Sequence, residues 1–308
     1  MCGSNDEMVV LPGGTFRMGS DRHYPEERPA HKVRVDPFRI DRHPVTNAAF
    51  ARFVAETGHV TSAERPADPA DYPGADPALL RPSSVVFVPP PHRVTLEDHY
   101  QWWHYIAGAD WRHPRGPGSS IDGMDQHPVV HVAFEDALAY ATWAGKALPT
   151  EAEWEFAARG GLEEAEFAWG EEFTPGGVHM ANTWQGEFPW QNLATDGHIG
   201  TSPVGAFPAN GYGLLDVAGN VWEWTIDWFQ HHEQLQGKPC CTLENPRGGC
   251  MEDSHDPAVP VRIPRRVMKG GSHLCAPNYC RRYRPAARMA QPIDTSTNHL
   301  GFRCVVRG

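Results

Sequence analysis

The stretch Gly219-Asn220-Val221-Trp222-Glu223-Trp224 is the most distinctive in this 308-residue chain, within a longer aromatic and glycine-rich run that begins at Gly211. The Gly-Asn pair indicates a tight turn, and the two tryptophans indicate buried anchors. Asp216 and Glu223 flank the turn, and Ca²⁺ is bound in proteins by carboxylates together with turn carbonyls. By composition alone, a hairpin with two surface acids explains the same residues better than a metal site.

The remainder of the chain has the composition of a loop-rich globular protein. It contains 30 glycines and 29 prolines beside 11 tryptophans and 13 phenylalanines, and 40% of its residues are hydrophobic. This apolar content suffices for a core, so the chain is not simply disordered. The formal net charge of −11 argues against a general nucleic-acid binder and against a protein of anionic membranes. No apolar run approaches the ~20 residues that a membrane helix needs.

The N-terminal residues 1–7 show neither the basic nor the apolar region of a secretory signal, and we expect them to be disordered. The seven cysteines are unevenly spaced, and an odd count without a signal favours reduced thiols. We therefore expect mostly reduced thiols and no disulfide scaffold. The cysteines lie at positions 2, 240, 241, 250, 275, 280 and 304.

Short periodic segments predict an α+β fold with unusually much irregular structure. Strands are expected over residues 8–11, 15–19, 31–41 and 84–88, and in patches of 267–306. Helices are expected where capping and stop residues bracket apolar periodicity, at 46–58, 134–144 and 150–160. An exposed excursion is expected at 240–264. Long irregular stretches usually indicate function or bound ions.

Cys275 and Cys280 are the first candidates for chemistry. Their spacing is not that of a zinc ribbon, and no second pair completes four ligands. A redox dithiol, a two-thiolate site for a soft ion such as Cu(I), and two unrelated thiols all stay open. From Arg262 to Ile293 there are eight cations and no acid, which favours thiolates because nearby cations lower a thiol's pKa. The plainer explanation is that these arginines pair with the acidic remainder of the chain.

Asn182 and Asp196 are a further candidate, since their side-chain oxygens lie in a coil-rich stretch that could hold another cation. Turn capping by Asn and Asp is the more ordinary explanation. His127 and His131 are four residues apart, but no acid follows where an iron site of two histidines and one carboxylate needs it. The sequence also lacks phosphate-loop, nucleophile-elbow and zinc-protease motifs.

Taken together, several motifs resemble those of the formylglycine-generating enzymes, the sulfatase-modifying-factor family. The motifs shared with the wider superfamily are Leu11–Ser20, Leu148–Glu155 and Gly219–Trp224. Those that resemble the generating enzymes themselves are Trp111–Pro114, Asn182–Pro189, Lys269–Cys275 and Tyr279–Arg284. The resemblance implies one C-type-lectin-like domain over residues 8–307, poor in regular structure and stabilised by Ca²⁺.

The resemblance also implies an activity. A cysteine in a Cys-x-Pro-x-Arg segment of an unfolded or nascent sulfatase would be oxidised by O₂ to Cα-formylglycine, with a thiol as reductant. Cu(I) would be bound by two thiolates, and the substrate cysteine would supply a third sulfur. Ser272 and Tyr279 would line the O₂ and proton-transfer side, and Trp222 would wall the pocket. The implied catalytic residues are thus Cys275, Cys280, Ser272, Tyr279 and Trp222.

Two calcium sites and a substrate groove belong to the same resemblance. One Ca²⁺ set is Asn182, Thr183, Asp196 and His198, and the other is Asp216, Gly219, Val221 and Glu223. Ser83 and Ser84, near the substrate-groove segment, are weaker candidates. Where secretory relatives carry structural disulfides, this chain has Ala141, Ala158 and Pro285, which leaves Cys304 without a partner. This departure fits a reducing, bacterial-type cytoplasm, and we expect a cytoplasmic protein.

Three other functions stay open at this point. The first is a peptide- or glycan-binding module of the same fold with idle cysteines. The second is an iron-dependent sulfoxide synthase, although such relatives add a helical bundle with a His-x3-His-x-Glu signature that is missing here. The third is a copper-free thiol redox catalyst, whose turnover would survive a Cu(I) chelator such as cyanide.

Overall fold

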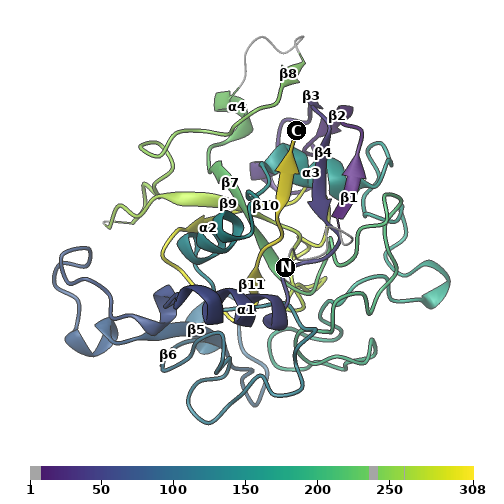
Figure 1. Ribbon diagram of the computed structural model, residues 1–308. Coiled ribbons are helices and arrows are strands. Elements are labelled where there is room, and N and C mark those ends of the chain that lie inside the picture. The colour runs from purple at the N-terminus through teal and green to yellow at the C-terminus, as the bar shows by residue number, and fades with distance from the viewer. Residues whose placement is uncertain (1–7, 236–241, 260) are drawn as a thin grey trace.

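The computed structural model describes residues 8–235, 242–259 and 261–308, and much of this chain is irregular (Figure 1). The α-helices are α1 (Asn47–Thr57), α2 (Phe134–Trp143), α3 (Glu151–Arg159) and α4 (His232–Leu235). Single 3-10 turns are η2 (Pro25–Glu27), η3 (Ser62–Glu64), η4 (Pro77–Leu80), η5 (His99–Gln101) and η6 (Pro175–Gly177). The predicted α+β class with little regular structure is confirmed.

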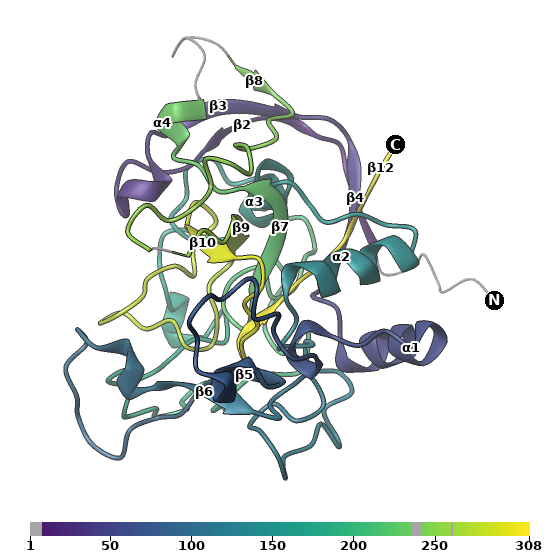
Figure 2. The same cartoon turned by 90° about the vertical axis from the view of Figure 1, so that its left-hand side faces the viewer.

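The strands are short and form several small sheets. They are β1 (Met8–Leu11), β2 (Gly14–Met18), β3 (His31–Val35), β4 (Phe38–Asp41), β5 (Ser83–Phe87), β6 (Trp103–Ala107), β7 (Trp222–Trp228), β8 (Leu243–Glu244), β9 (Arg265–Lys269), β10 (Arg288–Pro292), β11 (Leu300–Gly301) and β12 (Val305–Arg307). The central sheet has the order β10-β9-β7-β11. The β2-β3-β8 sheet lies at one end of the molecule and the β5-β6 pair at the opposite end (Figures 1 and 2). In the remaining sheet β4 pairs antiparallel with both β1 and β12, so the first and last strands meet across it.

Capping residues close in sequence set the ends of the helices, as predicted. Thr46 caps α1 by accepting a hydrogen bond from the Ala49 amide, and Gly58 ends the helix in the left-handed conformation at φ 70°. The Thr150–Glu153 capping box begins α3. The prediction of one strand over 31–41 is wrong, because the chain leaves the β2-β3 sheet at Pro37 and enters the β1-β4 sheet. Proline has no amide hydrogen to continue a strand ladder.

Aromatic side chains fill the core, as the sequence predicts. Five tryptophans are fully buried: Trp102, Trp111, Trp154, Trp222 and Trp224. One large cluster packs α1 and α2 against β7 and includes both Cys275 and Cys280. A smaller cluster of Trp102, Trp184, Phe188, Leu274 and Ala276 lies against the same cysteine loop. The candidate thiols therefore lie where two aromatic clusters meet.

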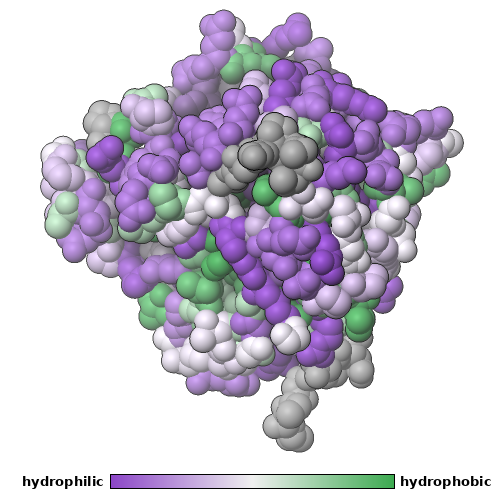
Figure 3. Space-filling view, turned by 90° about the horizontal axis from the view of Figure 1, so that it is seen from above, coloured by the Kyte–Doolittle hydropathy of each residue, from purple (hydrophilic) through white to green (hydrophobic). Residues whose placement is uncertain are grey.

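The described part of the 240–264 excursion includes β8, which pairs parallel with β3, and Cys250, which is exposed and free. Cys240, Cys241 and the expected disordered N-terminus at 1–7 lie outside the described residues. Seen from above, over the β2-β3-β8 end, the surface is mainly hydrophilic with scattered apolar spots (Figure 3). Within the ranges that the structure describes, no helix is long and apolar enough to cross a membrane.

Candidate active site

The loop between β9 and β10 brings the two candidate thiols together. Cys275 and Cys280 are 2% and 8% exposed, and their Sγ atoms lie 3.1 Å apart as free thiols. The amide of Cys280 donates to the Ala276 carbonyl at 2.8 Å, which closes the turn between them. Gly271 adopts φ 70°, and a Cβ there would lie 2.8 Å from the Arg282 carbonyl oxygen. Glycine is therefore required where the two arms of the loop cross.

Neighbouring segments hold this loop by backbone hydrogen bonds. The Trp184 amide donates to the Cys275 carbonyl at 3.0 Å. On the other side, Gly219 donates to the Gly270 carbonyl at 2.9 Å, and His273 donates to the Asn220 carbonyl at 3.0 Å. The stretch before β7 and the cysteine loop, separate in sequence, thus form one structural unit.

The electrostatic surroundings favour one thiolate. The hydrogen bond from Cys275 and the nearby Arg282 guanidinium lower the pKa of Cys280 to about 6. Arg282 Nη1 lies 3.9 Å from the Cys280 sulfur. Burial raises the pKa of Cys275, so the pair shares a proton in the absence of a further positive charge. This supports the thiolate prediction for the basic stretch.

Acidic residues from the N-terminal part of the chain hold these arginines in place. Arg284 forms a bidentate ion pair with Glu27, and both side chains are almost completely buried. Arg282 pairs with Glu26 at 2.6 Å and lies over the Tyr24 ring at 3.9 Å. We call the ion pairs Arg282–Glu26, Arg284–Glu27 and Arg288–Glu151 the buried frame. Sequence reasoning missed Glu26 and Glu27, although eight cations without a local acid were a signal that partners come from elsewhere.

Ser272 lies at the base of the loop and is fully buried. Its hydroxyl is 2.8 Å from His299 Nδ1 and accepts a hydrogen bond from the Leu274 amide at 3.2 Å. Burial lowers the pKa of His299, so this imidazole is neutral near pH 7. The hydrogen bond between His299 and Ser272 is therefore one between two uncharged groups. His299 was not singled out from the sequence, where it stands among 17 histidines.

Tyr279 is 40% exposed and marks the solvent side of the thiol loop. Its ring stacks on Phe188 at 4.4 Å between centroids and meets Trp102 edge-on at 5.7 Å. Phe188 and Trp102 are therefore wall residues that sequence reasoning missed. Trp222 is buried in the same cluster as both cysteines, and its role as a wall of the pocket stays a prediction.

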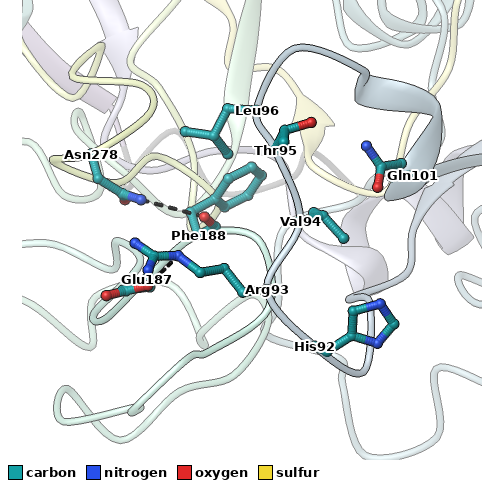
Figure 4. Close-up of a pocket in the computed structure, with 9 residues that line it drawn as sticks. All are labelled: His92, Arg93, Val94, Thr95, Leu96, Gln101, Glu187, Phe188 and Asn278. Carbon is teal, nitrogen blue, oxygen red and sulfur yellow. Dashed lines mark hydrogen bonds and ion pairs between the residues drawn. The ribbon is translucent and has the colours of Figure 1, made fainter.

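A pocket of about 680 Å³ opens beside this wall (Figure 4). Asn278, from the turn between the two cysteines, lies on one side and donates a hydrogen bond to the Phe188 carbonyl at 3.3 Å. Arg93 reaches across from the 92–96 segment to Glu187. The thiol loop thus continues directly into a surface pocket of peptide-binding size.

The two sulfurs fit a soft metal ion. A thiolate–metal bond of about 2.3 Å lets one ion contact two sulfurs up to about 4.6 Å apart, and the observed separation is shorter. Soft thiolate ligands select ions such as Cu(I). Across the described residues, no cluster of three or more His, Cys, Asp or Glu side chains is placed to hold a metal. Among the described His, Cys, Asp and Glu side chains, none therefore joins the two sulfurs as a third metal ligand.

The first calcium set is partly assembled. The Thr183 carbonyl and the Asp196 carboxylate both accept from the Gln185 side-chain amide, so these oxygens converge on a point that this neutral nitrogen occupies and that holds no positive charge. Asn182 is buried and uses its amide nitrogen on the Gly200 carbonyl, which leaves its carbonyl oxygen as an acceptor. His198 donates its backbone amide to Asp196 at 3.0 Å. Convergent oxygens of this kind suit a hard cation.

The second calcium set does not fit a cation in this arrangement. Both carboxylate oxygens of Glu223 accept from Arg303 at 2.7 Å, and Trp154 donates to one of them. Asp216 instead accepts from the Gly205 amide, and burial raises its pKa. Gly219 and Val221 lie in the intervening turn. Because a guanidinium already supplies the positive charge at Glu223, this set needs no metal to neutralise it.

The two serines proposed for the substrate groove lie in the interior. Ser84 is 1% exposed, and its hydroxyl meets the Ser296 hydroxyl at 2.6 Å and His131 Nδ1 at 2.7 Å. Ser83 donates to the Arg81 carbonyl. Their hydroxyls serve the packing of β5, so the geometry gives no support to a direct contact with substrate.

Comparison with known proteins identifies the family of this chain. Residues 2–308 match the family profile of the sulfatase-modifying factor enzyme 1-like domain. A formylglycine-generating enzyme of Mycobacterium tuberculosis is 56% identical over 97% of both chains, and one of Thermomonospora curvata is 48% identical over 96% of this chain and 92% of that one. The structure of PvdO from Pseudomonas aeruginosa, at 24% identity, superposes with a TM-score of 0.59 over 98% of this chain and 94% of that chain, which shows a shared fold. The chain therefore belongs to the sulfatase-modifying-factor family of formylglycine-generating enzymes.

Proposed function

We propose that this chain converts the cysteine of a sulfatase Cys-x-Pro-x-Arg segment to Cα-formylglycine, with Cu(I) bound by Cys275 and Cys280, O₂ as oxidant and a thiol as reductant. The observation that carries the proposal is the pair of buried free thiols 3.1 Å apart, with a guanidinium beside one of them. Similarity to enzymes of this name supports the reaction, and the chemistry of the donor set supports the metal.

The reaction balances with one O₂ and two reducing thiols. The substrate side chain, –CH₂–SH, becomes –CHO and releases H₂S. Both oxygen atoms of O₂ are reduced to water with two electrons from the substrate and two from the reducing thiols, and one water is consumed when the resulting thioaldehyde hydrolyses to the aldehyde and H₂S. The two reducing thiols supply two electrons and two protons and become a disulfide. Bound Cu(I) supplies the one-electron chemistry with O₂ that side chains lack.

The residues around the thiols then have separate tasks. Arg282 favours the thiolate form of Cys280 through its charge. Ser272, oriented by His299, offers a hydroxyl that exchanges protons near the thiols. Tyr279, Phe188 and Trp102 form an aromatic wall that limits the access of water to the sulfurs.

We further propose that the protein acts in the cytoplasm, on a sulfatase chain that is still unfolded. Cys275, Cys280 and Cys304 are buried and free, which supports a reducing compartment. An extended segment bound across the aromatic wall would position its cysteine sulfur at the thiol pair. One Ca²⁺ at Asn182, Thr183, Asp196 and His198 would stabilise the coil beside this wall.

Mass spectrometry of a Cys-x-Pro-x-Arg peptide tests the function directly. After incubation with the full-length protein, Cu(I), O₂ and dithiothreitol, we expect a mass loss of about 18 Da at the cysteine. The same peptide with serine in place of cysteine is the control and should be unchanged. An unaltered cysteine peptide, with copper bound and O₂ present, would contradict the proposal.

A copper-free thiol redox catalyst is the second candidate, because two sulfurs at 3.1 Å need only a small approach to form a disulfide. The two candidates differ in their response to cyanide. A chelator that removes Cu(I) should abolish formylglycine formation, whereas dithiol exchange should continue. Turnover that persists in cyanide would favour the second candidate.

A further inference from the structure

The β5-β6 pair has one covered edge and one free edge. On the side of β5, the Val85 amide donates to the Ser296 carbonyl at 3.1 Å, and the Asn298 amide donates to the Val85 carbonyl at 3.2 Å. On the side of β6, no further strand pairs with it among the residues that the structure describes. β6 is therefore the outer strand of a small sheet at one end of the molecule (Figures 1 and 2).

The register of the pair shows which backbone groups of β6 point outward. The Val88 amide donates to the Trp102 carbonyl at 2.9 Å, in line with the β5-β6 ladder. In an antiparallel pair, residues that bond to the partner strand alternate with residues whose groups point away from it. The outward N–H and C=O groups therefore belong to Trp103, Tyr105 and Ala107. None of these groups has a hydrogen-bond partner within the described ranges.

The sequence of β6 does not protect this edge. Residues 103–107 contain no acid, lysine, arginine or proline. Natural edge strands are usually protected by charges, by proline or by a covering segment, and β10, an edge of the central sheet, begins at Arg288 and ends at Pro292. The Tyr105 side chain is 49% exposed, and Tyr100, just before β6, is 73% exposed. An uncharged edge with exposed aromatic side chains is suited to pair with another extended chain.

The free edge begins near the active site but lies outside the pocket. The Trp103 ring lies 4.8 Å from the His299 ring, whose Nδ1 atom is 2.8 Å from the Ser272 hydroxyl. Gln101, two residues before β6, lines the pocket beside the thiol loop, whereas none of the described residues 103–107 does. β6 continues for five residues, which is about 17 Å of strand. A chain paired with β6 would thus lie next to the active site on a surface of its own.

An unfolded polypeptide is the occupant that these outward groups fit. Its backbone N–H and C=O groups have no partners in its own chain, and strand addition pairs them with the free groups of β6. A folded protein presents few such groups, because its own helices and strands use them. The bound side chains need only suit an uncharged surface, so no particular motif is required.

We propose that the outer edge of β6 is a docking strand for unfolded polypeptide, which binds by strand addition to Trp103, Tyr105 and Ala107 independently of any motif. This binding goes beyond the proposed function, since it needs neither a Cys-x-Pro-x-Arg segment nor copper. It favours the unfolded over the folded state of a chain and holds that chain near the active site.

A peptide without cysteine or arginine tests the docking strand. The probe is a short fluorescent peptide of alternating valine and threonine between terminal lysines. Its twin carries N-methyl groups on all central residues, so it cannot donate backbone hydrogen bonds. For the wild-type protein, we expect the plain peptide to bind at least about tenfold more tightly than the methylated twin in fluorescence anisotropy. Equal affinities of the two peptides would overturn the proposal.

Two substitutions at Tyr105 locate the binding on β6. Tyr105→Pro removes the outward N–H, and proline is tolerated on an edge strand where the N–H faces solvent. Tyr105→Ala loses the same aromatic ring but keeps the N–H, so it is the matched control. We expect Tyr105→Pro to bind the plain peptide at least about threefold more weakly than Tyr105→Ala. Equal binding by the two variants would place the peptide elsewhere and overturn the assignment to β6.

Urea titration of both variants checks that they fold. If Tyr105→Pro does not fold, Ala107→Pro removes the neighbouring outward N–H and is compared with wild type in the same way. Sedimentation tests a second copy of the chain as the alternative occupant. A wild-type dimer that Tyr105→Pro dissociates, together with no binding of the plain peptide, would overturn the proposal in favour of pairing between two β6 strands.

The mass-spectrometric assay separates the docking strand from the proposed function. If the wild-type protein binds the plain peptide but produces no mass loss from the Cys-x-Pro-x-Arg peptide, the docking strand stands and the reaction does not. If the mass loss occurs while the plain peptide and its methylated twin bind equally, the reaction stands and the docking strand is overturned.

Discussion

Two flanks of the cysteine loop use the same kind of interaction for opposite purposes. On one flank, the buried frame joins Arg284 to Glu27 with side chains 1% and 0% exposed. On the other, Arg93 and Glu187 are 75% and 47% exposed. A buried charge without its partner is very costly, whereas an exposed pair contributes almost nothing. The frame flank therefore fixes the second thiol, whereas the ion pair on the pocket flank contributes little to stability.

The largest expected effect comes from replacing the two thiols that lie between these flanks. Cys275→Ala or Cys280→Ala should lower formylglycine formation at least about 10³-fold, because each removes half of the protein's donor set. Cys250→Ser, at an exposed free cysteine, is the control for loss of a thiol as such. Normal turnover in either alanine variant would refute the assigned roles.

The frame predicts a large loss of stability at a distance from the chemistry. Glu27→Gln leaves Arg284 buried without a counter-ion and should reduce the free energy of unfolding by about 3–5 kcal/mol in urea titration. Glu166→Gln breaks the partly exposed Arg281–Glu166 pair at 2.9 Å and should cost below about 1 kcal/mol. Equal effects of the two variants would remove the distinction between buried frame and exposed pairs.

The frame also shows where sequence reasoning ends. Thr46 and Gly58 bracket α1 as expected, because caps act within one or two turns of the chain. The Arg284–Glu27 pair joins residues that are 257 positions apart in the sequence. A basic stretch indicates that acidic partners are needed, but it does not indicate which acids they are. The thiol pair itself was predicted from five-residue spacing and family likeness, and the structure brings its sulfurs to 3.1 Å.

The calcium predictions divide for the same reason. Asp196 and Glu223 are both acids in irregular, turn-rich stretches, so composition treats them alike. In the folded chain Asp196 and the Thr183 carbonyl converge, while Glu223 is neutralised by Arg303, 80 positions away in sequence. Local pattern supplies the oxygens, and tertiary structure decides whether a cation or a guanidinium neutralises them.

Chelation should distinguish these two sites. For the wild-type protein with Ca²⁺ at about 100 times its Kd, removal by EGTA should reduce the free energy of unfolding by about 2.7 kcal/mol. Asp196→Asn should abolish this response, since it removes a charged ligand of the first set. The expected stoichiometry is one Ca²⁺ per chain. Two bound ions, or no response of the wild type to EGTA, would contradict the assignment.

Asp227, at the edge of the frame, predicts a pH dependence. It accepts a hydrogen bond from the Glu151 amide, and burial raises the pKa of its carboxyl from 3.8 to about 7. Between those pH values the folded state holds a proton that the unfolded state has lost, so this group makes stability fall as pH rises. Asp227→Asn should therefore be more stable than the wild type by on the order of 1–3 kcal/mol at pH 8.

The comparison at two pH values isolates that group. Near pH 4 the stability advantage of Asp227→Asn should shrink toward zero. At that pH the Asp227 carboxyl of the folded wild type is protonated, so both folded proteins carry a neutral side chain at this position. Titrating groups distant from Asp227 are common to both proteins and cancel in the difference. An advantage that is the same at pH 4 and pH 8 would assign the effect to packing and not to protonation.

The smallest expected change in the free energy of unfolding concerns the Arg93–Glu187 pair on the pocket flank. Arg93→Ala and Glu187→Gln should each change the free energy of unfolding by less than about 0.5 kcal/mol, measured by urea titration beside Glu27→Gln. Neither side chain loses a buried partner, because Arg93 is 75% exposed and Glu187 keeps its hydrogen bond from Trp190 as a neutral amide. A loss of more than about 1 kcal/mol in either variant would make the pair structural, and the pocket flank would then belong with the frame.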